Sequence, residues 1–265
     1  MKFSLQNRWV LITGASSGFG AAAARAFAQE GANLLLGARR LDRLHHVAAD
    51  ASQLGAPEAL VRHLDVSQTL SVNDFLAWAK TEIAQRSSAE PSLTVLVNNA
   101  GGALGLDTVE TGKDEDWESM MQSNVLGLLR VTRAALPLLK NSPGASVINI
   151  GSVASHDAYE GGAAYCAAKA GERQITRALR LELNGTGIRV ASVDPGMAET
   201  EFSLVRFKGD AARAAKVYEG THPLTADDVA EIILWVATRP AHVNIDELIV
   251  KPTDQASVFK VFRRK

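Results

Sequence analysis

Seven short runs of Val, Ile and Leu alternate along the chain with longer amphipathic segments. The runs show little of the polar alternation expected of a half-exposed strand, so each predicts a strand buried on both faces. They lie at residues 9–13, 33–36, 60–64, 94–97, 146–150, 189–193 and 247–250. The intervening segments have helical length and spacing and lie at about 18–30, 40–54, 68–86, 114–140, 165–184 and 225–238. This alternation favours parallel pairing with right-handed crossovers. It predicts an α/β protein with one doubly wound, seven-stranded parallel sheet flanked by helices.

No linker rich in Pro, Ser and Gly divides the sequence, and no internal repeat is present, which predicts a single domain over residues 1–265. The longest stretch without clear periodicity runs from Asp194 to Leu224. It follows the sixth predicted strand, at the edge where open parallel sheets bind their ligands. Loops of this length are uncommon unless they are functional, so we expect a substrate lid at about 194–224.

Charge and cysteine content exclude several classes of protein. Lys and Arg total 28 while Asp and Glu total 29, which does not suit a dedicated nucleic-acid binder or a polybasic membrane binder. Cys166 is the single cysteine, so the chain cannot form an intramolecular disulfide or a cysteine-based zinc site. The sequence contains no signal-peptide core and no run of about twenty apolar residues. We expect a cytoplasmic protein with a small-molecule substrate, and no nucleic-acid, membrane or metal partner.

A glycine-rich turn lies between the first predicted strand and the first predicted helix. It reads Thr13-Gly14-Ala15-Ser16-Ser17-Gly18-Phe19-Gly20. Gly14, Gly18 and Gly20 allow a tight turn, close approach of a pyrophosphate and close packing of helix on strand, while the helix N-terminus attracts anions. A purely structural turn at a helix start would look similar. The absence of a G-K-[ST] ending argues against a P-loop NTPase.

The end of the second predicted strand should meet the adenosine ribose of a dinucleotide. It reads Gly37-Ala38-Arg39-Arg40 and lacks the carboxylate that an NAD site typically places there. Arginines at a helix start are disfavoured by the helix dipole unless an anion compensates them. A 2′-phosphate would bind both guanidinium groups, so Arg39 and Arg40 favour NADP. The alternative is a solvated surface pair.

Further candidates follow the third and fourth predicted strands. Asp65, with its neighbour Val66, is placed to contact the adenine, although Asp65 would serve equally well as a helix-capping residue. The segment Asn98-Asn99-Ala100-Gly101 lets the backbone approach the cofactor, and we select Asn98, Ala100 and Gly101 as contacts. Without the glycine-rich turn this segment would read merely as a turn.

Tyr165 and Lys169 are four residues apart at the start of a predicted helix and share one face. A phenol needs about 4 kcal/mol of preference for the phenolate to work as an acid near neutral pH. A lysine charge about 5 Å away supplies roughly 3 kcal/mol of it at an effective dielectric of about 20. Ser152 follows the fifth predicted strand and reaches the same pocket, where it can bond the substrate oxygen. Asn124 is an unusual mid-helix polar residue, alternatively a satisfied buried amide.

The glycine-rich turn, the segment 98–101, Asn124, Ser152, Tyr165, Lys169 and the pair Pro195-Gly196 follow one another between about residue 5 and residue 250. In this order they resemble the motifs of the short-chain dehydrogenase/reductase family. The resemblance implies a Rossmann fold, nicotinamide chemistry and a homotetramer. It also implies a catalytic tetrad of Asn124, Ser152, Tyr165 and Lys169, in which Lys169 also holds the nicotinamide ribose and Asn124 orders a water. Tyr165 then adjoins the cofactor, and Pro195, Gly196 and Thr200 contact its nicotinamide end.

Within the family, residues 200–210 and 241–245 resemble the NADP-dependent 3-hydroxy acid dehydrogenases that act on serine and allo-threonine. The segment Met197-Ala198-Glu199 departs from that pattern. Arg206 and Lys208 lie in the predicted lid, and Arg206 is preferred for a substrate carboxylate because a guanidinium binds it at two points. An exposed lid charge is the alternative. Two other functions stay open: a carbonyl reductase acting on acyl thioesters or neutral ketones, and a non-catalytic NADP(H)-sensing module.

Overall fold

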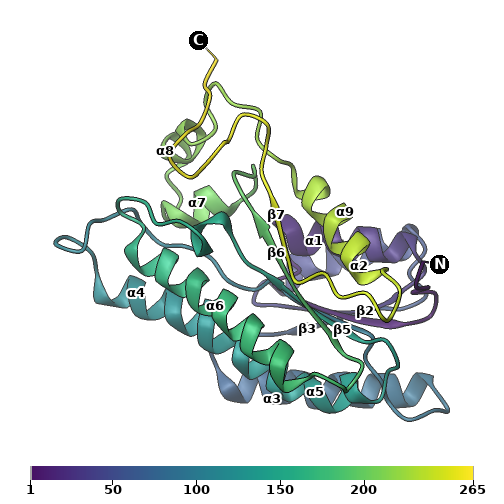
Figure 1. The fold of residues 1–265 in the computed structure, drawn as a ribbon. Helices are drawn as coiled ribbons and strands as arrows, with labels where there is room; N and C mark the ends of the chain where they lie inside the picture. The colour runs from purple at the N-terminus through teal and green to yellow at the C-terminus, as the bar shows by residue number, and fades with distance from the viewer. Residues whose placement is uncertain (1, 265) are drawn as a thin grey trace.

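A computed structural model describes residues 2–264, which contain the seven predicted strands in one parallel sheet (Figure 1). The strands are β1 (Trp9–Thr13), β2 (Asn33–Ala38), β3 (Ala59–His63), β4 (Val95–Asn98), β5 (Ser146–Ile150), β6 (Arg189–Pro195) and β7 (Glu247–Val250). Every pairing between neighbours is parallel. The prediction of a seven-stranded, doubly wound parallel sheet is confirmed.

The strand order is β3-β2-β1-β4-β5-β6-β7. The first three strands are therefore added toward one edge of the sheet and the last four toward the other, with the change between β1 and β4. Val10 of β1 pairs with Leu34 of β2 on one side and with Val95 of β4 on the other. At such a switch point the loops that leave the two central strands turn to opposite faces and open a crevice at the carboxyl ends. The topology therefore places the ligand site beside the glycine-rich turn.

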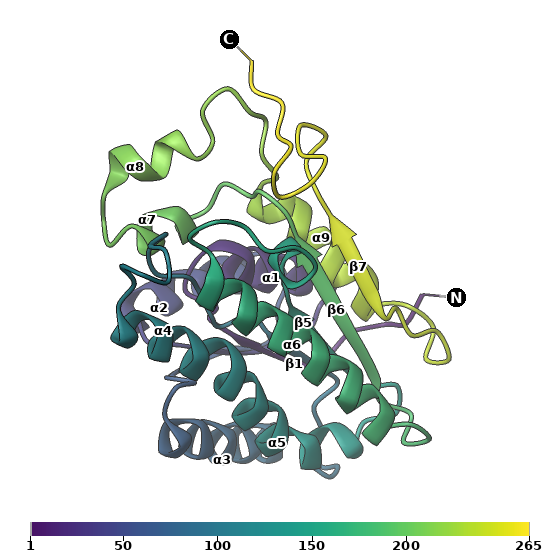
Figure 2. The same ribbon diagram turned by 60° about the vertical axis from the view of Figure 1, so that its left-hand side comes forward.

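Helices cover both faces of the sheet (Figures 1 and 2). One face carries α1 (Gly18–Gln29), α2 (Leu41–Gln53) and α9 (Ala226–Ala237). The opposite face carries α3 (Thr69–Arg86), α5 (Gly127–Lys140) and α6 (Ala163–Glu182), with α4 (Asp114–Met120) at one end. These bounds agree with the predicted helices to within two residues, apart from the segment 114–140.

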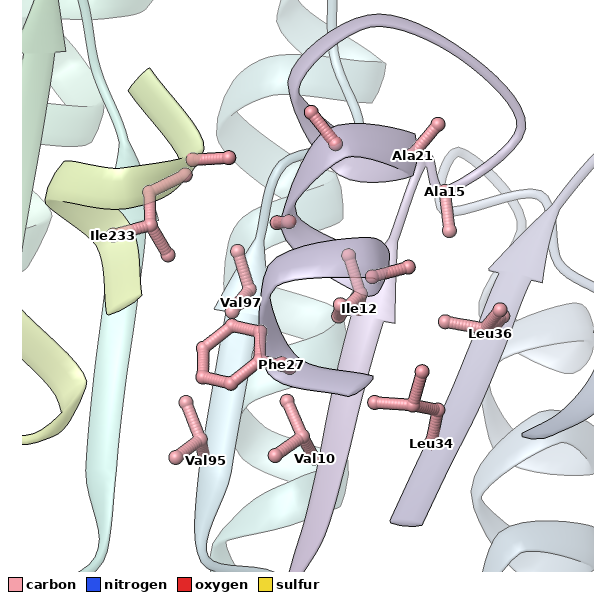
Figure 3. Close-up of a cluster of buried hydrophobic side chains, with 14 of the residues drawn as sticks. Val10, Ile12, Ala15, Ala21, Phe27, Leu34, Leu36, Val95, Val97 and Ile233 are labelled. Carbon is pink, nitrogen blue, oxygen red and sulfur yellow. The ribbon is translucent and has the colours of Figure 1, made fainter. Parts of the chain in front are cut away.

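The core that fixes α1 is built from short apolar side chains of the sheet (Figure 3). Phe27 of α1 is fully buried against Val10, Val95 and Val97 of the two central strands, and Ile233 of α9 lies beside it. Burying each large apolar side chain contributes roughly 1.5–3 kcal/mol relative to leaving it exposed. This packing holds the N-terminus of α1, and with it the glycine-rich turn, at the carboxyl edge of the sheet.

The segment 114–140, predicted as one helix, is interrupted by a π-helical turn, η1 (Met121–Leu126). Inside it the Asn124 side chain donates to the carbonyl of Met120, 2.7 Å away, and competes with the regular backbone pattern. Single π turns inside helices occur frequently at functional sites. The hydrophobic spacing alone could not reveal the break, because both flanking helices keep their apolar faces on the core.

The lid prediction differs from the structure at its start. Asp194 and Pro195 belong to β6, so the irregular segment begins at Gly196. It then contains α7 (Phe202–Arg206) and α8 (Ala211–Lys216), and a bridge between Ala198 and Leu224 closes its base. Helices of one turn are too short to produce a detectable hydrophobic period. Within residues 2–264, no helix combines the length and apolar character needed to cross a membrane.

Candidate active site

A pocket of about 1400 Å³ extends along the carboxyl ends of β1 to β6. Residues of the irregular segment 196–224, called the lid segment below after the prediction, form part of its wall. It brings together most of the predicted site residues. These are Gly14, Ser16, Ser17, Gly18, Phe19, Arg39, Arg40, Asp65, Val66, Ala100, Gly101, Ser152, Tyr165, Lys169, Pro195, Gly196, Thr200 and Arg206. Three predicted residues, Gly20, Asn98 and Asn124, lie outside this lining among the residues that the structure describes.

The glycine-rich turn is clamped to the loop after β4. Gly14 has a φ of +66°, and a Cβ there would lie 2.9 Å from the Cα of Ala100. The Asn99 side chain donates to the carbonyls of Thr13 and Gly14, at 3.0 and 3.2 Å, and the Thr13 hydroxyl accepts from the backbone of Asn99 and Ala100. Gly18, with φ +53°, begins α1. The turn therefore presents free backbone N–H groups in a fixed position.

Gly20 and Asn98 support the site from behind. A Cβ on Gly20 would lie 2.5 Å from the carbonyl oxygen of Gly14, so a glycine is needed here for α1 to pack closely against the turn. The Asn98 side chain donates to Thr132 and Asn149 in the interior, both at 2.9 Å, so only its backbone is left for the predicted contact with the cofactor, which stays a prediction. Adjacent strand residues point to opposite faces, so Asn99 occupies the position next to the turn instead.

Arg40 connects three parts of the pocket. Its Nε and Nη2 donate to the hydroxyl of Ser16, and Nη2 also donates to the hydroxyl of Ser17 at 2.7 Å. Its Nη1 donates to Glu201 of the lid segment at 3.0 Å. Arg39 is exposed beside it. Cationic and hydroxyl groups that converge in this way form a site for an anion.

Asp65 makes a local turn. Its carboxylate accepts from the backbone N–H and the hydroxyl of Ser67, at 2.9 and 2.7 Å. Burial acts to raise the pKa of Asp65, but the two bonds from Ser67 together with the nearby charges of Arg39 and His63 outweigh it, and the pKa lies below its ordinary value. Helix α3 begins only at Thr69, so Asp65 does not cap that helix. Its side chain remains at the pocket wall.

Ser152 follows β5 by two residues and caps a short 3-10 turn, η2 (Val153–Ser155), by accepting from the backbone of Ala154 at 3.1 Å. The Ser155 hydroxyl donates to the carbonyl of Ser152 at 2.6 Å. His156 then bonds the fully buried Asp194 of β6, with 2.6 Å between Nε2 and Oδ2. These contacts hold the Ser152 hydroxyl at the pocket, since both flanks of its loop are tied.

Tyr165 lies in the first turn of α6 and is only 8% exposed. Its ring packs against Phe202 of α7, with 5.7 Å between centroids. The Lys169 ammonium lies 5.9 Å from the centre of the Tyr165 ring. The predicted pairing of these two side chains on one helical face is therefore present in the structure.

The contacts of Lys169 include a residue that sequence reasoning missed. Its Nζ donates to the carbonyl of Ile150 at 3.0 Å and to both carboxylate oxygens of Glu172, at 3.0 and 2.8 Å. Burial acts to lower the pKa of Lys169, but the adjacent Glu172 carboxylate raises it above its ordinary value. Burial also raises the pKa of Glu172, to about 7. The three-residue spacing of Lys169 and Glu172 on a helix was the available signal.

Asn124 is fully buried in η1 and binds the loop after β4. Its Oδ1 accepts from the N–H of Gly102 and its Nδ2 donates to the carbonyl of Gly102, both at 3.0 Å. A Cβ on Gly101 would lie 2.5 Å from Asn124 Oδ1. The amide is therefore satisfied and joins the helix to the pocket wall, while the place of Asn124 in the catalytic tetrad stays a prediction.

Arg206 at the end of α7 reaches over the candidate catalytic residues. Its Nε donates to the carbonyl of Gly105 and its Nη2 to the hydroxyl of Tyr159, both at 2.9 Å. The guanidinium carbon lies 5.6 Å from the centre of the Tyr165 ring. Lys208 instead pairs with Asp116 at 2.8 Å. Tyr159, which sequence reasoning missed, is largely buried, and burial raises its pKa to about 12.

The order of these elements matches a known family model. Residues 8–209 match the model described as short chain dehydrogenase, which covers the glycine-rich turn, Ser152, Tyr165 and Lys169. The chain belongs to the short-chain dehydrogenase family. The family resemblance seen in the sequence is thereby confirmed.

Individual relatives of this short-chain dehydrogenase are similar over almost their whole length. Sulfoacetaldehyde reductase 2 of Chromohalobacter salexigens is 46% identical over 96% of this chain and 98% of its own. Serine 3-dehydrogenase of Agrobacterium fabrum is 40% identical over 96% of this chain and 98% of its own. A solved closed form of serine dehydrogenase complexed with NADP+ is 38% identical, with a TM-score of 0.85 over 97% of this chain and 100% of that one.

The pocket of this short-chain dehydrogenase fits a nicotinamide dinucleotide. Its volume exceeds the roughly 300–1,000 Å³ of common small-ligand sites, and it runs from Arg39 and Arg40, which follow β2, to Tyr165. Gly14 and Gly18 leave the backbone open where a pyrophosphate must approach. Within residues 2–264, no group of three His, Cys, Asp or Glu side chains is arranged to hold a metal ion.

Proposed function

We propose that this short-chain dehydrogenase uses NADP to interconvert a short 3-hydroxy acid, such as serine or allo-threonine, with its 3-oxo acid. The observation that carries the substrate class is the position of Arg206, whose guanidinium lies 5.6 Å from the ring of Tyr165. A cation at this distance from the proton donor suits a substrate whose acid group is separated from the reacting carbon by one or two bonds.

The residues that would hold NADP are those of the glycine-rich turn and the start of α2. Backbone N–H groups from Ser16 to Gly18 face the pyrophosphate position at the N-terminus of α1. Arg40, with the hydroxyls of Ser16 and Ser17, supplies donors for a 2′-phosphate. Ala38 at the end of β2 offers no carboxylate to repel that phosphate. Lys169 and Thr200 line the other end of the pocket, where the nicotinamide ribose belongs.

When bound, the nicotinamide accepts or supplies the hydride. Tyr165 donates or takes the proton of the substrate oxygen, and Ser152 donates a hydrogen bond to that oxygen as charge develops. Lys169 contributes positive charge beside the phenol, because its ammonium is buried 5.9 Å from the ring. A non-catalytic sensing module would need the binding residues but no such proton donor.

A second candidate substrate is a short sulfonate. It is favoured by the 46% identity with a sulfoacetaldehyde reductase. A sulfonate carries a single negative charge on three oxygens, and a guanidinium binds it with the same paired N–H groups as a carboxylate. Arg206 would serve both classes, so the choice between them depends on the space around the acid group.

Turnover of a matched substrate panel tests this proposal. Reduction of sulfoacetaldehyde and of neutral ketones with NADPH, and oxidation of serine and allo-threonine with NADP, are followed by absorbance of the reduced cofactor. We expect Arg206→Ala to raise KM for the acids at least tenfold, since a charge-assisted bond is worth about 1.5–3 kcal/mol, and to leave KM for neutral ketones unchanged. Lys208→Gln, which removes a nearby lid charge, is the control.

Two results would contradict the substrate class. If Arg206→Ala changes KM for acids and neutral ketones equally, Arg206 does not bind the acid group. If the wild type prefers neutral ketones or acyl thioesters to all free acids, the alternative of a general carbonyl reductase holds.

The assembly and location are also part of the proposal. We expect a homotetramer, as the family resemblance implies, and a cytoplasmic location, which the single cysteine supports because it fits a reducing compartment. Light scattering after gel filtration measures the assembly, and a monomer in solution would contradict it.

A further inference from the structure

Glu201 brings a negative charge from the lid segment to the arginines of the cofactor pocket. Its carboxylate accepts from Nη1 of Arg40 at 3.0 Å and from Nη1 of Arg43. Both arginines lie at the start of α2, whereas Glu201 immediately precedes α7. The contact therefore joins two parts of the pocket that are far apart in the sequence.

Arg40 takes part in two groups of contacts at once. Its Nε and Nη2 face Ser16 and Ser17 of the glycine-rich turn, while Nη1 faces Glu201. A phosphate binds a guanidinium through two parallel N–H groups. A 2′-phosphate at this arginine would therefore stand within a few ångströms of the Glu201 carboxylate, and two anions at that distance repel each other.

The carboxylate is charged under working conditions. Its bonds with Arg43 and Arg40 lower the pKa of Glu201 below the ordinary value despite partial burial. The side chains of Glu201, Arg40 and Arg43 are 38%, 40% and 43% exposed. Ion pairs with this exposure are weak, so a bound phosphate can displace the carboxylate at small cost.

We propose that Glu201 is a cofactor-specificity residue that competes with the 2′-phosphate of NADP for Arg40. This inference rests on the proposed use of NADP at this pocket. In the absence of cofactor, the carboxylate neutralises the arginines and holds α7 against α2. Binding of the 2′-phosphate releases the carboxylate, and because Arg206 ends the same short helix, the cofactor and the acid-binding arginine become coupled. NAD lacks the phosphate and leaves the Glu201 contact in place.

Calorimetric titration of the intact protein with NADP+ and with NAD+ tests the competition. We expect Glu201→Gln to bind NADP+ at least threefold more tightly than wild type, because the amide keeps the size of the side chain but loses the repelling charge. The affinity for NAD+ should stay within a factor of two. The gain for NADP+ should shrink in 0.5 M salt, since screening weakens interactions between partly exposed charges.

Two further variants separate competition from simple loosening of the lid. Asp116→Asn breaks the Lys208–Asp116 pair, another ion pair of the lid segment, and should leave both affinities unchanged. In the background of Arg40→Ala, Glu201→Gln should no longer tighten NADP+ binding, because the shared partner is missing. Glu201→Ala serves the same comparison if the glutamine variant does not fold.

The outcomes distinguish this inference from the proposed function beneath it. A wild type that binds NADP+ no more tightly than NAD+ overturns the proposed cofactor. A wild type that prefers NADP+, with a Glu201→Gln variant that binds it equally or more weakly, overturns the competition alone. Equal tightening by Asp116→Asn also overturns it, since lid release would then suffice.

Discussion

Lys169 and Glu172 form a buried ion pair one helical turn from Tyr165, with Nζ bonded to both carboxylate oxygens at 3.0 and 2.8 Å. Their side chains are 8% and 5% exposed. Charges removed from water in this way are retained only with close partners, because the desolvation penalty of each ion is several kcal/mol. Glu172 thus belongs to the electrostatic surroundings of the candidate proton donor.

Replacing Glu172 by Gln should change how stability depends on pH. Burial raises the pKa of Glu172 to about 7 from an ordinary value of 4.5, so the folded protein holds this proton more tightly than the unfolded chain. The carboxyl therefore lowers the free energy of unfolding as pH rises from 4.5 to 7. Relative to wild type, the stability of Glu172→Gln should therefore rise as pH rises through this window, because the amide has no proton to release.

Urea unfolding at several pH values measures this difference. Glu182→Gln, an exposed change on the same helix, is the control and should alter stability by less than about 0.5 kcal/mol. A wild-type-to-Glu172→Gln difference that does not vary between pH 4.5 and 8 would show that Glu172 titrates normally.

Tyr165→Phe should abolish turnover while leaving cofactor affinity nearly intact. The hydroxyl supplies a proton, and the ring, packed against Phe202, keeps its place without it. Loss of general acid catalysis costs about 10² to 10⁴ in rate. Steady-state kcat and calorimetric Kd for NADP+ are measured on the same preparation, and near wild-type kcat would remove Tyr165 from the catalytic assignment.

Cofactor preference should depend on the residues that end β2 and begin α2. Arg40→Ala removes charge-assisted bonds worth about 1.5–3 kcal/mol each, so NADP should bind at least about tenfold more weakly while NAD is unaffected. Arg25→Ala, whose side chain pairs with Asp227, is the control. Equal losses of affinity for NADP and NAD would mean that Arg40 supports the fold and does not bind the 2′-phosphate.

The double change Ala38→Asp with Arg39→Ala should invert the preference from NADP to NAD. Ala38 is buried at the end of β2, and a carboxylate there would repel a phosphate while accepting bonds from ribose hydroxyls. The ratio of kcat/KM for the two cofactors is the measurement. An unchanged ratio would place the discrimination elsewhere in the pocket.

Gly101→Ala should damage the site through Asn124. The new Cβ would lie 2.5 Å from Asn124 Oδ1, whereas a Cβ on Gly102 would meet nothing within 4 Å among the described residues. Overpacking of this kind costs typically 1–3 kcal/mol. Urea unfolding should show that loss for Gly101→Ala and less than about 1 kcal/mol for Gly102→Ala. Equal stabilities of Gly101→Ala and Gly102→Ala would mean that the π turn can shift to make room for the new methyl group without a measurable cost.

Much of this protein follows from local sequence patterns. The buried strands were predicted from apolar runs, because both faces of a parallel sheet are covered. The helices were predicted from the helical spacing of their apolar residues. The glycine-rich turn and Ser152 were identified because strand ends converge at one edge of such a sheet, and Tyr165 and Lys169 because their four-residue spacing puts them on one helical face. Each of these inferences needs only the order of elements and a short motif.

The contacts between distant segments were decided by the tertiary structure alone. Asn98 turned inward and Asn99 toward the cofactor pocket, because the last strand residue and its successor face opposite sides. The bonds of Glu201 with Arg40 and of Arg206 with Tyr159 join segments 161 and 47 residues apart. No local period or propensity encodes such pairs, since they exist only once the sheet and the lid have brought the side chains into reach.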